Sequence, residues 1–346
     1  MDVILLIYAI IMLRMSFSMF RKWKTVNDHQ YSYSIIAACR NEEERLPRFL
    51  ASLEHLSYPV DLYEIILVDD ASDDNSLQIL NDFAKDKPHV QVISILQEEK
   101  TGKGKRQALS LAAFKAKNEI LLFTDADTEV PENWISSYNS YFYTLVGMVI
   151  GYVRLKNLTG MNRVKRIFSS GLFCSTAGMG MPFSCSGGNM AIKRSVFEEI
   201  GGYEGLGDFH AGDDKLLLKQ VAKTGQLIAY NADVKVIEQN RTYTFRQWFD
   251  RELRHFGKFR QSALLFQIVT ILGMAFFLFL PLMILHQAKW LPFIYIITPI
   301  YFFYTCSIMK HKERFQVFDY LLLILYPYYV IFFTIIGTFR KAVWKA

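Results

Sequence analysis

Short apolar runs that end abruptly at charged residues constrain the fold of this chain more than any other feature. They cover residues 34–38, 64–68 and 119–123. Between the runs, stretches 43–56 and 76–85 place apolar residues three and four positions apart, as one face of a helix does. Strands buried on both faces read as continuous apolar runs, and their alternation with helices indicates a parallel sheet covered by helices. We therefore expect an α/β fold.

The expected α/β domain extends over residues 31–246, and its acidic clusters directly follow the apolar runs. These clusters begin at Asp69 and at Asp125. In open parallel sheets, ligands bind outside the carboxyl ends of the strands. The acidic clusters are therefore predicted to lie together at one edge of the sheet and to line a binding site.

The triplet Asp125-Ala126-Asp127 is the first candidate for chemistry. Two carboxylates that flank a small residue at a strand end can share one hard cation, because Mg²⁺ and Mn²⁺ prefer oxygen ligands. A cation bound there would neutralise the charge that develops on a departing diphosphate. The alternative is a solvated aspartate turn, since so short a motif recurs by chance.

Four aspartates crowd into six positions after the second run, namely Asp69, Asp70, Asp73 and Asp74. Neighbouring carboxylates repel each other, so turn formation alone explains them poorly. An acceptor carboxylate at a strand end can bind a nucleobase N–H or a ribose hydroxyl. The alternative is an Asx-turn that caps the next helix, and both roles can coexist within the cluster.

A basic, glycine-containing segment occupies residues 101–109 and includes Lys103, Lys105 and Arg106. Glycines let the backbone approach a ligand, and three cations within four residues suit an anionic donor. The segment lacks the phosphate-loop consensus. A basic helix start exposed to water would look the same.

Glycine pairs and a second acidic pair follow further along the chain, at Gly187-Gly188, Gly201-Gly202 and Asp213-Asp214. The glycine pairs indicate tight loops that line a cleft. A carboxylate in such a cleft can act as a general base towards a hydroxyl. Alternatively, one of the two aspartates caps a helix over residues 215–223 while the other faces the cleft.

Apolar segments at both ends of the chain predict a membrane protein, and 51% of all residues are hydrophobic. Residues 1–22 are expected to form an uncleaved anchor, because basic residues follow the apolar run instead of preceding it. Residues 247–263, rich in arginine and aromatic side chains, predict an amphipathic helix at the bilayer surface.

The C-terminal region, residues 264–346, contains apolar blocks at 264–285, 290–309 and 318–337. Each block is about long enough to span a bilayer, so two or three transmembrane helices are expected. Pro327 lies in the middle of the last block, which leaves a re-entrant or interfacial hairpin as an alternative.

Charge and cysteine usage suggest where the expected enzyme domain lies. The formal net charge of +6 gathers beside the apolar segments, which favours a cytoplasmic membrane face over nucleic acid. The four cysteines show neither paired nor metal-ligand spacing and indicate reduced thiols. We expect a multi-pass protein of the cell (inner, cytoplasmic) membrane with its catalytic domain in the cytoplasm, and no nucleic-acid partner.

In this order and spacing, the segments resemble glycosyltransferase family 2, whose catalytic domain has the GT-A fold, a Rossmann-like α/β architecture. The resemblance extends from about residue 34 to residue 255. Two positions depart from the family pattern. The usual Glu-Asp base motif stands here as Asp213-Asp214, and the Gln-x-x-Arg-Trp motif of processive members stands as residues 251–255, where only Arg254 remains. The second departure implies single transfers instead of polymer growth.

The resemblance also implies a role for each matching residue. Asp127, with Asp125, would bind the divalent cation. Asp214 would be the catalytic base beside Asp213, and Arg254 would stabilise the leaving diphosphate. Gly188 and Asn189 would lie on the acceptor side. The residues implied to bind the donor nucleotide are Ala38, Arg40, Glu42, Asp69, Asp70, Lys103 and Asp125.

The function that follows from the resemblance is inverting transfer of a sugar from a UDP- or GDP-sugar to a hydroxyl group, with Mg²⁺ or Mn²⁺ as cofactor. The acceptor would be a membrane lipid, a polyprenyl-linked intermediate or a glycan. One alternative is a synthase of polyprenyl-phosphate sugars, in which a phosphate is the acceptor. Another is a membrane protein that binds a nucleotide sugar without catalysis.

Overall fold

The computed structural model describes residues 2–25, 29–100, 104–206, 212–239, 243–257, 264–287 and 291–339. The chain forms two compact units. The sheet unit comprises Arg21–Lys156 and Thr176–Gln239. The helical unit comprises Met1–Phe20, Asn157–Ser175 and Asn240–Ala346. Each unit is described separately below.

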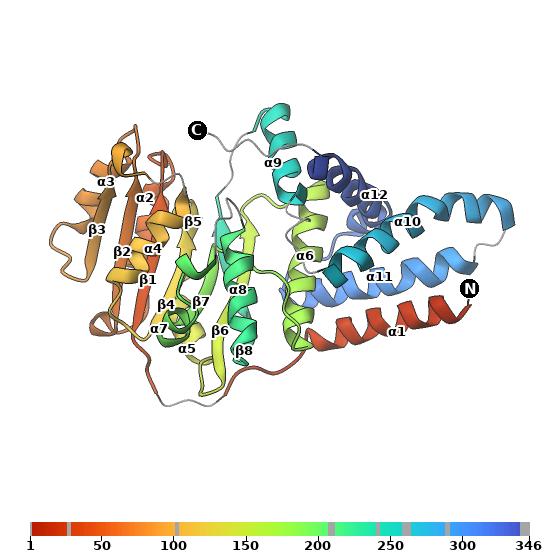
Figure 1. Ribbon diagram of the computed structural model, residues 1–346, viewed down its shortest axis with the longest axis horizontal. Helices are drawn as coiled ribbons and strands as arrows, with labels where there is room; N and C mark the ends of the chain where they lie inside the picture. The colour runs from red at the N-terminus through yellow and green to blue at the C-terminus, as the bar shows by residue number, and fades with distance from the viewer. Residues whose placement is uncertain are drawn as a thin grey trace. The chain divides into compact units, whose positions relative to one another are not determined.

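Within the described residues, the sheet unit contains one eight-stranded sheet with the strand order β3-β2-β1-β4-β7-β6-β8-β5 (Figure 1). The three apolar runs form three of these strands, and every residue of the first strand is buried. The strands are β1 (Tyr33–Cys39), β2 (Tyr63–Asp70), β3 (Val90–Ile95), β4 (Ile120–Asp125), β5 (Thr128–Glu129), β6 (Val146–Leu155), β7 (Asn189–Lys193) and β8 (Leu227–Glu238).

The expectation of an α/β fold is confirmed, but the expectation of a purely parallel sheet is wrong. Strands β3, β2, β1 and β4 pair in parallel. Strand β7 then pairs antiparallel with both β4 and β6. β6 and β8 are parallel to each other, whereas β5 and β8 are antiparallel. The short strand β7 inserts between two longer strands in the reverse direction, so the sheet is mixed.

Helices of the sheet unit follow the apolar spacing of the sequence. The helix predicted over 76–85 is α3 (Ser76–Ala84). The helix predicted over 43–56 is shorter, α2 (Leu46–Glu54), and has a proline in its first turn, where the missing N–H has no helical partner to lose. The remaining helical segments are α4 (Lys105–Lys115), α5 (Trp134–Asn139), α7 (Arg194–Glu199), α8 (Asp213–Lys223), η1 (Val60–Leu62), η2 (Gln97–Glu99) and η3 (Glu204–Leu206).

The helical unit contains α1 (Asp2–Ser18), most of α6 (Gly160–Gly178), α9 (Phe245–Gly257), α10 (Leu264–Gln287), α11 (Leu291–Lys310) and α12 (Val317–Phe339). α1 lies alongside α11, where the Tyr8 hydroxyl donates to the Ile296 carbonyl over 3.1 Å (Figure 1). Of the described helices, α12 alone is long and apolar enough to cross a membrane, and two shorter apolar stretches occupy Leu5–Ser18 and Thr270–Phe279. α12 continues through Pro327 as one helix, so a hairpin within the last block is not what forms.

A buried ionic cluster lies inside the helical unit. The Arg163 guanidinium on α6 donates to the Asp319 carboxylate on α12 over 2.8 Å, and it lies 3.6 Å from the Glu313 carboxylate. All three side chains are at most 2% exposed. The Tyr304 hydroxyl donates to the same Asp319 oxygen over 3.0 Å. A buried guanidinium needs such partners, because leaving one charge unpaired costs several kcal/mol.

Helix α9 packs its aromatic side against α12. Trp248 and Phe249 both contact the Phe333 ring, with centroids 5.7 and 5.4 Å away. Near the end of the contact, a Cβ added to Gly257 would lie 2.8 Å from the Gly337 carbonyl oxygen, so only glycine lets the two backbones approach this closely. The segment predicted to lie at a bilayer surface therefore has much of its apolar side covered by protein.

Candidate active site

The carboxyl ends of β2, β1 and β4 meet at one edge of the sheet, and those of β2 and β4 are acidic. In the β1–β2 register, Cys39 is opposite Asp69, and in the β1–β4 register Ala38 is opposite Asp125. The carboxyl ends of parallel strands share an edge by construction. The structure therefore brings together Ala38, Asp69 and Asp125, which the sequence places up to 87 positions apart.

The aspartates after β2 divide into two kinds. Asp69 is 2% exposed, and one of its oxygens accepts the Ser72 N–H over 3.2 Å. Asp70 forms an ion pair of 3.1 Å with Lys100, and both side chains are at most 11% exposed. Asp74 instead accepts the Ser76 N–H over 2.9 Å at the start of α3. Asp74 thus caps the start of α3, whereas Asp69 bonds to the turn that follows the strand and Asp70 is paired at the strand end.

Other residues expected at the nucleotide differ in how the structure uses them. Arg40 is partly exposed just beyond β1. Glu42 is 8% exposed, and its carboxylate accepts a hydrogen bond of 3.1 Å from Arg45. Lys103 lies outside the described residues. The structure thus presents Arg40 to solvent near the strand end and commits the Glu42 carboxylate largely to its own loop.

Lys105 contacts the acidic end of β4, and sequence reasoning did not single it out. It is the first residue of α4, after Gly104 at a φ of 55°, and its ammonium donates to the Asp125 carboxylate. Burial disfavours the charged ammonium. The carboxylates of Asp125, Asp127 and Asp214 outweigh burial and raise the pKa of Lys105 above the ordinary lysine value. The basic segment 101–109 indicated that a cation lies near the site. Its sequence did not show which of the cations faces the carboxylates.

The turn at Gly187-Gly188 connects the two acidic pairs. A Cβ added to Gly188 would lie 2.7 Å from Asp125 Oδ2, and a Cβ added to Gly187 would lie 3.6 Å from the Asp214 Cβ. The Thr124 hydroxyl donates to the Gly188 carbonyl over 3.0 Å and fixes the turn against β4. Asp125 and Asp214 therefore flank the same glycine turn, with Lys105 beside them.

Asp213 and Asp214 occupy the first turn of α8, so the helix predicted over 215–223 begins two residues earlier. The N-cap residue is Gly212, at a φ of 88°, and no side chain caps it. The prediction that one aspartate serves as the N-cap is therefore wrong. Asp214 is half-buried, and its Oδ1 accepts the Lys215 N–H over 2.9 Å. Negative charge in the first turn is favoured by the helix dipole.

Asn189, predicted on the acceptor side, has a fully buried side chain. The amide oxygen accepts from the Trp134 indole over 2.9 Å and from the Tyr138 hydroxyl over 2.7 Å, and its nitrogen donates to the Tyr152 carbonyl over 3.0 Å. These bonds hold β7 in place. The acceptor-side role of Asn189 stays a prediction.

Asp125 and Asp127 fit a divalent cation that is shared with substrate phosphates. Both are partly exposed, whereas Ala126 between them is buried. Across the part of the chain that the structure describes, no three Asp, Glu, His or Cys side chains gather into a complete metal cage. Mg²⁺ usually takes one or two carboxylates plus phosphate oxygens, so a pair suffices when the cation arrives with a diphosphate.

Replacing Gly188 by Ala should lower the rate of the catalysed reaction by about 10², because the new methyl group displaces the Asp125 carboxylate, and a shift near 1 Å can cost that much. Steady-state rates at increasing Mn²⁺ would measure the loss. Gly273→Ala is the control, since a Cβ there meets nothing within 4 Å. Full activity of the Gly188 variant at ordinary Mn²⁺ concentrations would show that the turn does not position Asp125.

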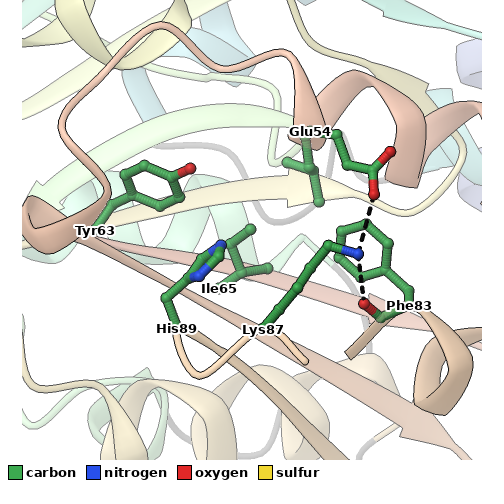
Figure 2. A pocket seen from close by; sticks show the side chains of 7 residues that line it. Glu54, Tyr63, Ile65, Phe83, Lys87 and His89 are labelled. Atoms are coloured by element: carbon green, nitrogen blue, oxygen red, sulfur yellow. Dashed lines mark hydrogen bonds and ion pairs between the residues drawn. The ribbon is translucent and has the colours of Figure 1, made fainter. Parts of the chain in front are cut away.

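A separate hollow of about 260 Å³ lies at the opposite edge of the sheet. Tyr63 begins β2 and His89 precedes β3, so the hollow is at the amino ends of these strands. Figure 2 shows the Lys87 ammonium between the Glu54 carboxylate, 3.0 Å away, and the Phe83 carbonyl, 2.9 Å away. The Lys87 ammonium in this hollow is thus already paired with Glu54. None of the predicted site residues lines the hollow.

Arg254 belongs to α9 in the helical unit. Its predicted role, stabilisation of a leaving diphosphate, stays a prediction.

Sequence comparisons place the same segments in known families. The profile described as Glycosyl transferase family 2 matches residues 34–201, and the profile described as Glycosyl transferase family group 2 matches residues 120–335. The second match covers more than half of the chain and includes the apolar C-terminal segments.

Curated relatives are more distant. The probable glycosyltransferase YdaM of Bacillus subtilis is 25% identical over 67% of this chain and 56% of its own. The poly-beta-1,6-N-acetyl-D-glucosamine synthase of Staphylococcus epidermidis is 25% identical over 60% of this chain and 49% of its own. The undecaprenyl-phosphate 4-deoxy-4-formamido-L-arabinose transferase of Pectobacterium atrosepticum is 33% identical over 34% and 36%. The chain spans about half the length of the first two relatives.

Among solved structures, a mannosyltransferase from Pyrobaculum calidifontis in complex with GDP-Man and Mn²⁺ has the same fold. The TM-score is 0.63, with 17% identity over 97% of this chain and 94% of that one.

Proposed function

Because the chain belongs to glycosyltransferase family 2 and has the GT-A fold, we propose that it is an inverting, metal-dependent enzyme that glycosylates a membrane-associated acceptor. The donor in this proposal is a UDP- or GDP-sugar and the acceptor group is a hydroxyl. Several relatives are named for lipid, lipid-linked or glycan products, which supports these acceptor classes.

One observation carries the proposal: Asp125 and Asp214 flank the Gly187-Gly188 turn, with the Lys105 ammonium beside them. Negative charge develops on the departing diphosphate and is stabilised by positive charge on that side of the sugar. Removal of the acceptor proton needs a carboxylate on the other side. The Lys105 ammonium and the Asp214 carboxylate supply these two groups near the Gly187-Gly188 turn.

The proposed reaction is one displacement at the anomeric carbon. Asp214 accepts the proton of the acceptor hydroxyl as its oxygen forms the new glycosidic bond. The bond from the anomeric carbon to the diphosphate oxygen breaks in the same step, and the nucleoside diphosphate leaves with that electron pair. Asp125 and Asp127 would hold a divalent cation, which when bound neutralises charge on the diphosphate. Asp69 and Asp70 lie where they can accept hydrogen bonds from the nucleoside.

We place the acceptor at a membrane because of the apolar surface of the helical unit. α12 is long and apolar enough to span, and apolar side chains stay exposed along it and along α1, including Leu6, Phe17, Leu325 and Phe332. Exposed apolar surface on this scale marks a membrane or protein contact. A multi-pass arrangement with the sheet unit in the cytoplasm fits the positions of the basic residues beside the apolar segments.

The proposed enzyme transfers single sugars, because the Gln-x-x-Arg-Trp pattern of processive members is reduced to Arg254 within residues 251–255. The Staphylococcus epidermidis relative is named as a polymer synthase, so product length is a direct test of this point.

Membranes that contain the protein, incubated with a panel of UDP- and GDP-sugars and Mn²⁺, should yield a lipid-extractable product one sugar heavier than its acceptor. Mass spectrometry of the lipid fraction identifies donor and acceptor together. Membranes with Asp127→Asn are the control. Products found solely on soluble sugars would contradict the membrane acceptor, and a ladder of products would contradict single transfer.

A polyprenyl-phosphate sugar synthase is the second candidate, favoured by the relative named for undecaprenyl phosphate. A phosphate acceptor is already ionised and needs no base. Tolerance of Asp214→Asn, together with an acid-labile sugar-phosphate lipid among the products, would favour this candidate.

A further inference from the structure

Two lysines that follow β3, one in the connecting segment and one at the first position of α4, neutralise the two acidic strand ends. Lys100 pairs with Asp70 at the end of β2, and Lys105 pairs with Asp125 at the end of β4. The first pair is nearly buried, with side chains 11% and 8% exposed. The second is open, at 42% and 37%. The Lys100–Asp70 pair is therefore largely shielded from solvent, whereas solvent reaches the Lys105–Asp125 pair.

Lys105 stands at a position that helices disfavour for a cation. It is the first residue of α4, next to the positive end of the helix dipole. The pair of carboxylates on β4 and the Asp214 carboxylate hold its ammonium there, as the raised pKa of the lysine reflects despite its partial burial. The helix itself does not favour a lysine at this position. The lysine is stabilised there by the nearby carboxylates of Asp125, Asp127 and Asp214.

The same Asp125 carboxylate is one of the two that fit a divalent cation. Lys105 already bonds to Asp125 Oδ1, and Asp125 Oδ2 faces the Gly188 turn, which leaves no room for a Cβ. An ammonium and a divalent cation bound to the same carboxylate repel each other. Each is therefore expected to weaken the binding of the other at Asp125.

We propose that Lys105 is the resident counter-ion of Asp125 in the donor-free enzyme, and that it exchanges with the divalent cation when the nucleotide sugar binds. This inference rests on the metal role of Asp125 and Asp127 in the proposed function. The displaced ammonium moves from the carboxylate to the donor diphosphate, for which a lysine is a suitable point-charge partner. Donor and cation therefore bind as one unit, and the donor-free enzyme holds the cation weakly.

The test measures Mn²⁺ binding by electron paramagnetic resonance of the free ion, on the full-length protein in detergent without donor. Lys105→Met should bind Mn²⁺ at least about tenfold more tightly than the natural chain, because its competitor for Asp125 is gone. With saturating Mn²⁺, the same variant should bind UDP and GDP about tenfold more weakly, because the diphosphate loses a cation. The two affinities are expected to change in opposite directions.

Lys115→Met is the matched control, since it removes the same charge from the exposed end of α4, about 15 Å along the helix. Its Mn²⁺ affinity should equal that of the natural chain. Lys105→Arg keeps the charge and should keep Mn²⁺ binding weak, which separates exchange from a disturbed fold. An unchanged or weaker Mn²⁺ affinity in Lys105→Met would overturn the exchange.

Asp127→Asn separates this failure from failure of the proposed function. If Asp127→Asn abolishes Mn²⁺ binding while Lys105→Met leaves it unchanged, the metal site stands and the exchange alone is overturned. If Asp127→Asn binds Mn²⁺ like the natural chain, the metal assignment is wrong, and the exchange falls with it.

Discussion

Replacement of Asp127 by Asn is expected to lower kcat for sugar transfer by about 10² to 10³, which corresponds to about 3 to 4 kcal/mol of transition-state stabilisation. The amide keeps the shape of the side chain but removes the negative charge that binds a divalent cation. Asp127 follows β4 directly and stays partly exposed, so it can reach a bound diphosphate. Initial rates at saturating donor and rising Mn²⁺ measure the effect.

Asp61→Asn is the control for this loss. Asp61 lies in η1, before the amino end of β2, so it undergoes the same chemical change at the opposite edge of the sheet. Its variant should transfer sugar at the natural rate. Thermal unfolding of both variants should match the natural chain, because neither residue is buried. An Asp127→Asn enzyme with natural kcat and natural Mn²⁺ dependence would remove this residue from the metal site.

Replacement of Asp214 by Asn should lower kcat by about 10² to 10⁴, the usual range for a lost general base. Its donor KM should change little, because the carboxylate acts on the acceptor and only in the transition state. One hydrogen bond orients the Asp214 carboxylate, because its Oδ1 accepts the Lys215 N–H. A Cβ added to Gly187 would lie 4.0 Å from its Oδ2. Separate measurement of kcat and KM tests the assignment.

Asp213→Asn and Asp82→Asn frame this result. Asp213 shares the first turn of α8. If Asp213→Asn loses this activity while Asp214→Asn keeps the natural kcat, the base is Asp213. Asp82 forms an exposed ion pair with Lys85, and such pairs contribute little, so its variant should match the natural enzyme. Full activity of both the Asp213→Asn and the Asp214→Asn enzymes would point to a phosphate acceptor.

The half of the sheet built from β1, β2 and β4 could be predicted from the sequence, because strands covered on both faces show continuous apolar runs. The other half could not. β6 contains Gly147 and Gly151, which weaken a strand pattern, yet a Cβ on Gly151 would come within 2.4 Å of the Tyr138 hydroxyl. The reversed direction of β7 depends on strands far away in the chain, and no local pattern records it.

The site divides in the same way. Asp69 and Asp125 were predictable at the same edge of the sheet, because the carboxyl ends of parallel strands share one edge, although β1 lies between the two strands that carry them. The burial of Asn189 could not be predicted from its position beside a glycine pair, because its bonds to Trp134 and Tyr138 come from tertiary packing. Lys105 was overlooked in favour of Lys103, because the sequence does not show that α4 begins with Lys105.

The Arg163–Asp319 pair sets an order on how the helical unit can be made. Its two members are 156 positions apart in the chain, so the ribosome finishes α6 long before it begins α12. Until then the guanidinium has neither Asp319 nor Glu313 to pair with, and it must stay hydrated or be shielded by another protein. Pairing of the Arg163 guanidinium with Asp319 is therefore completed only after α12 has been made.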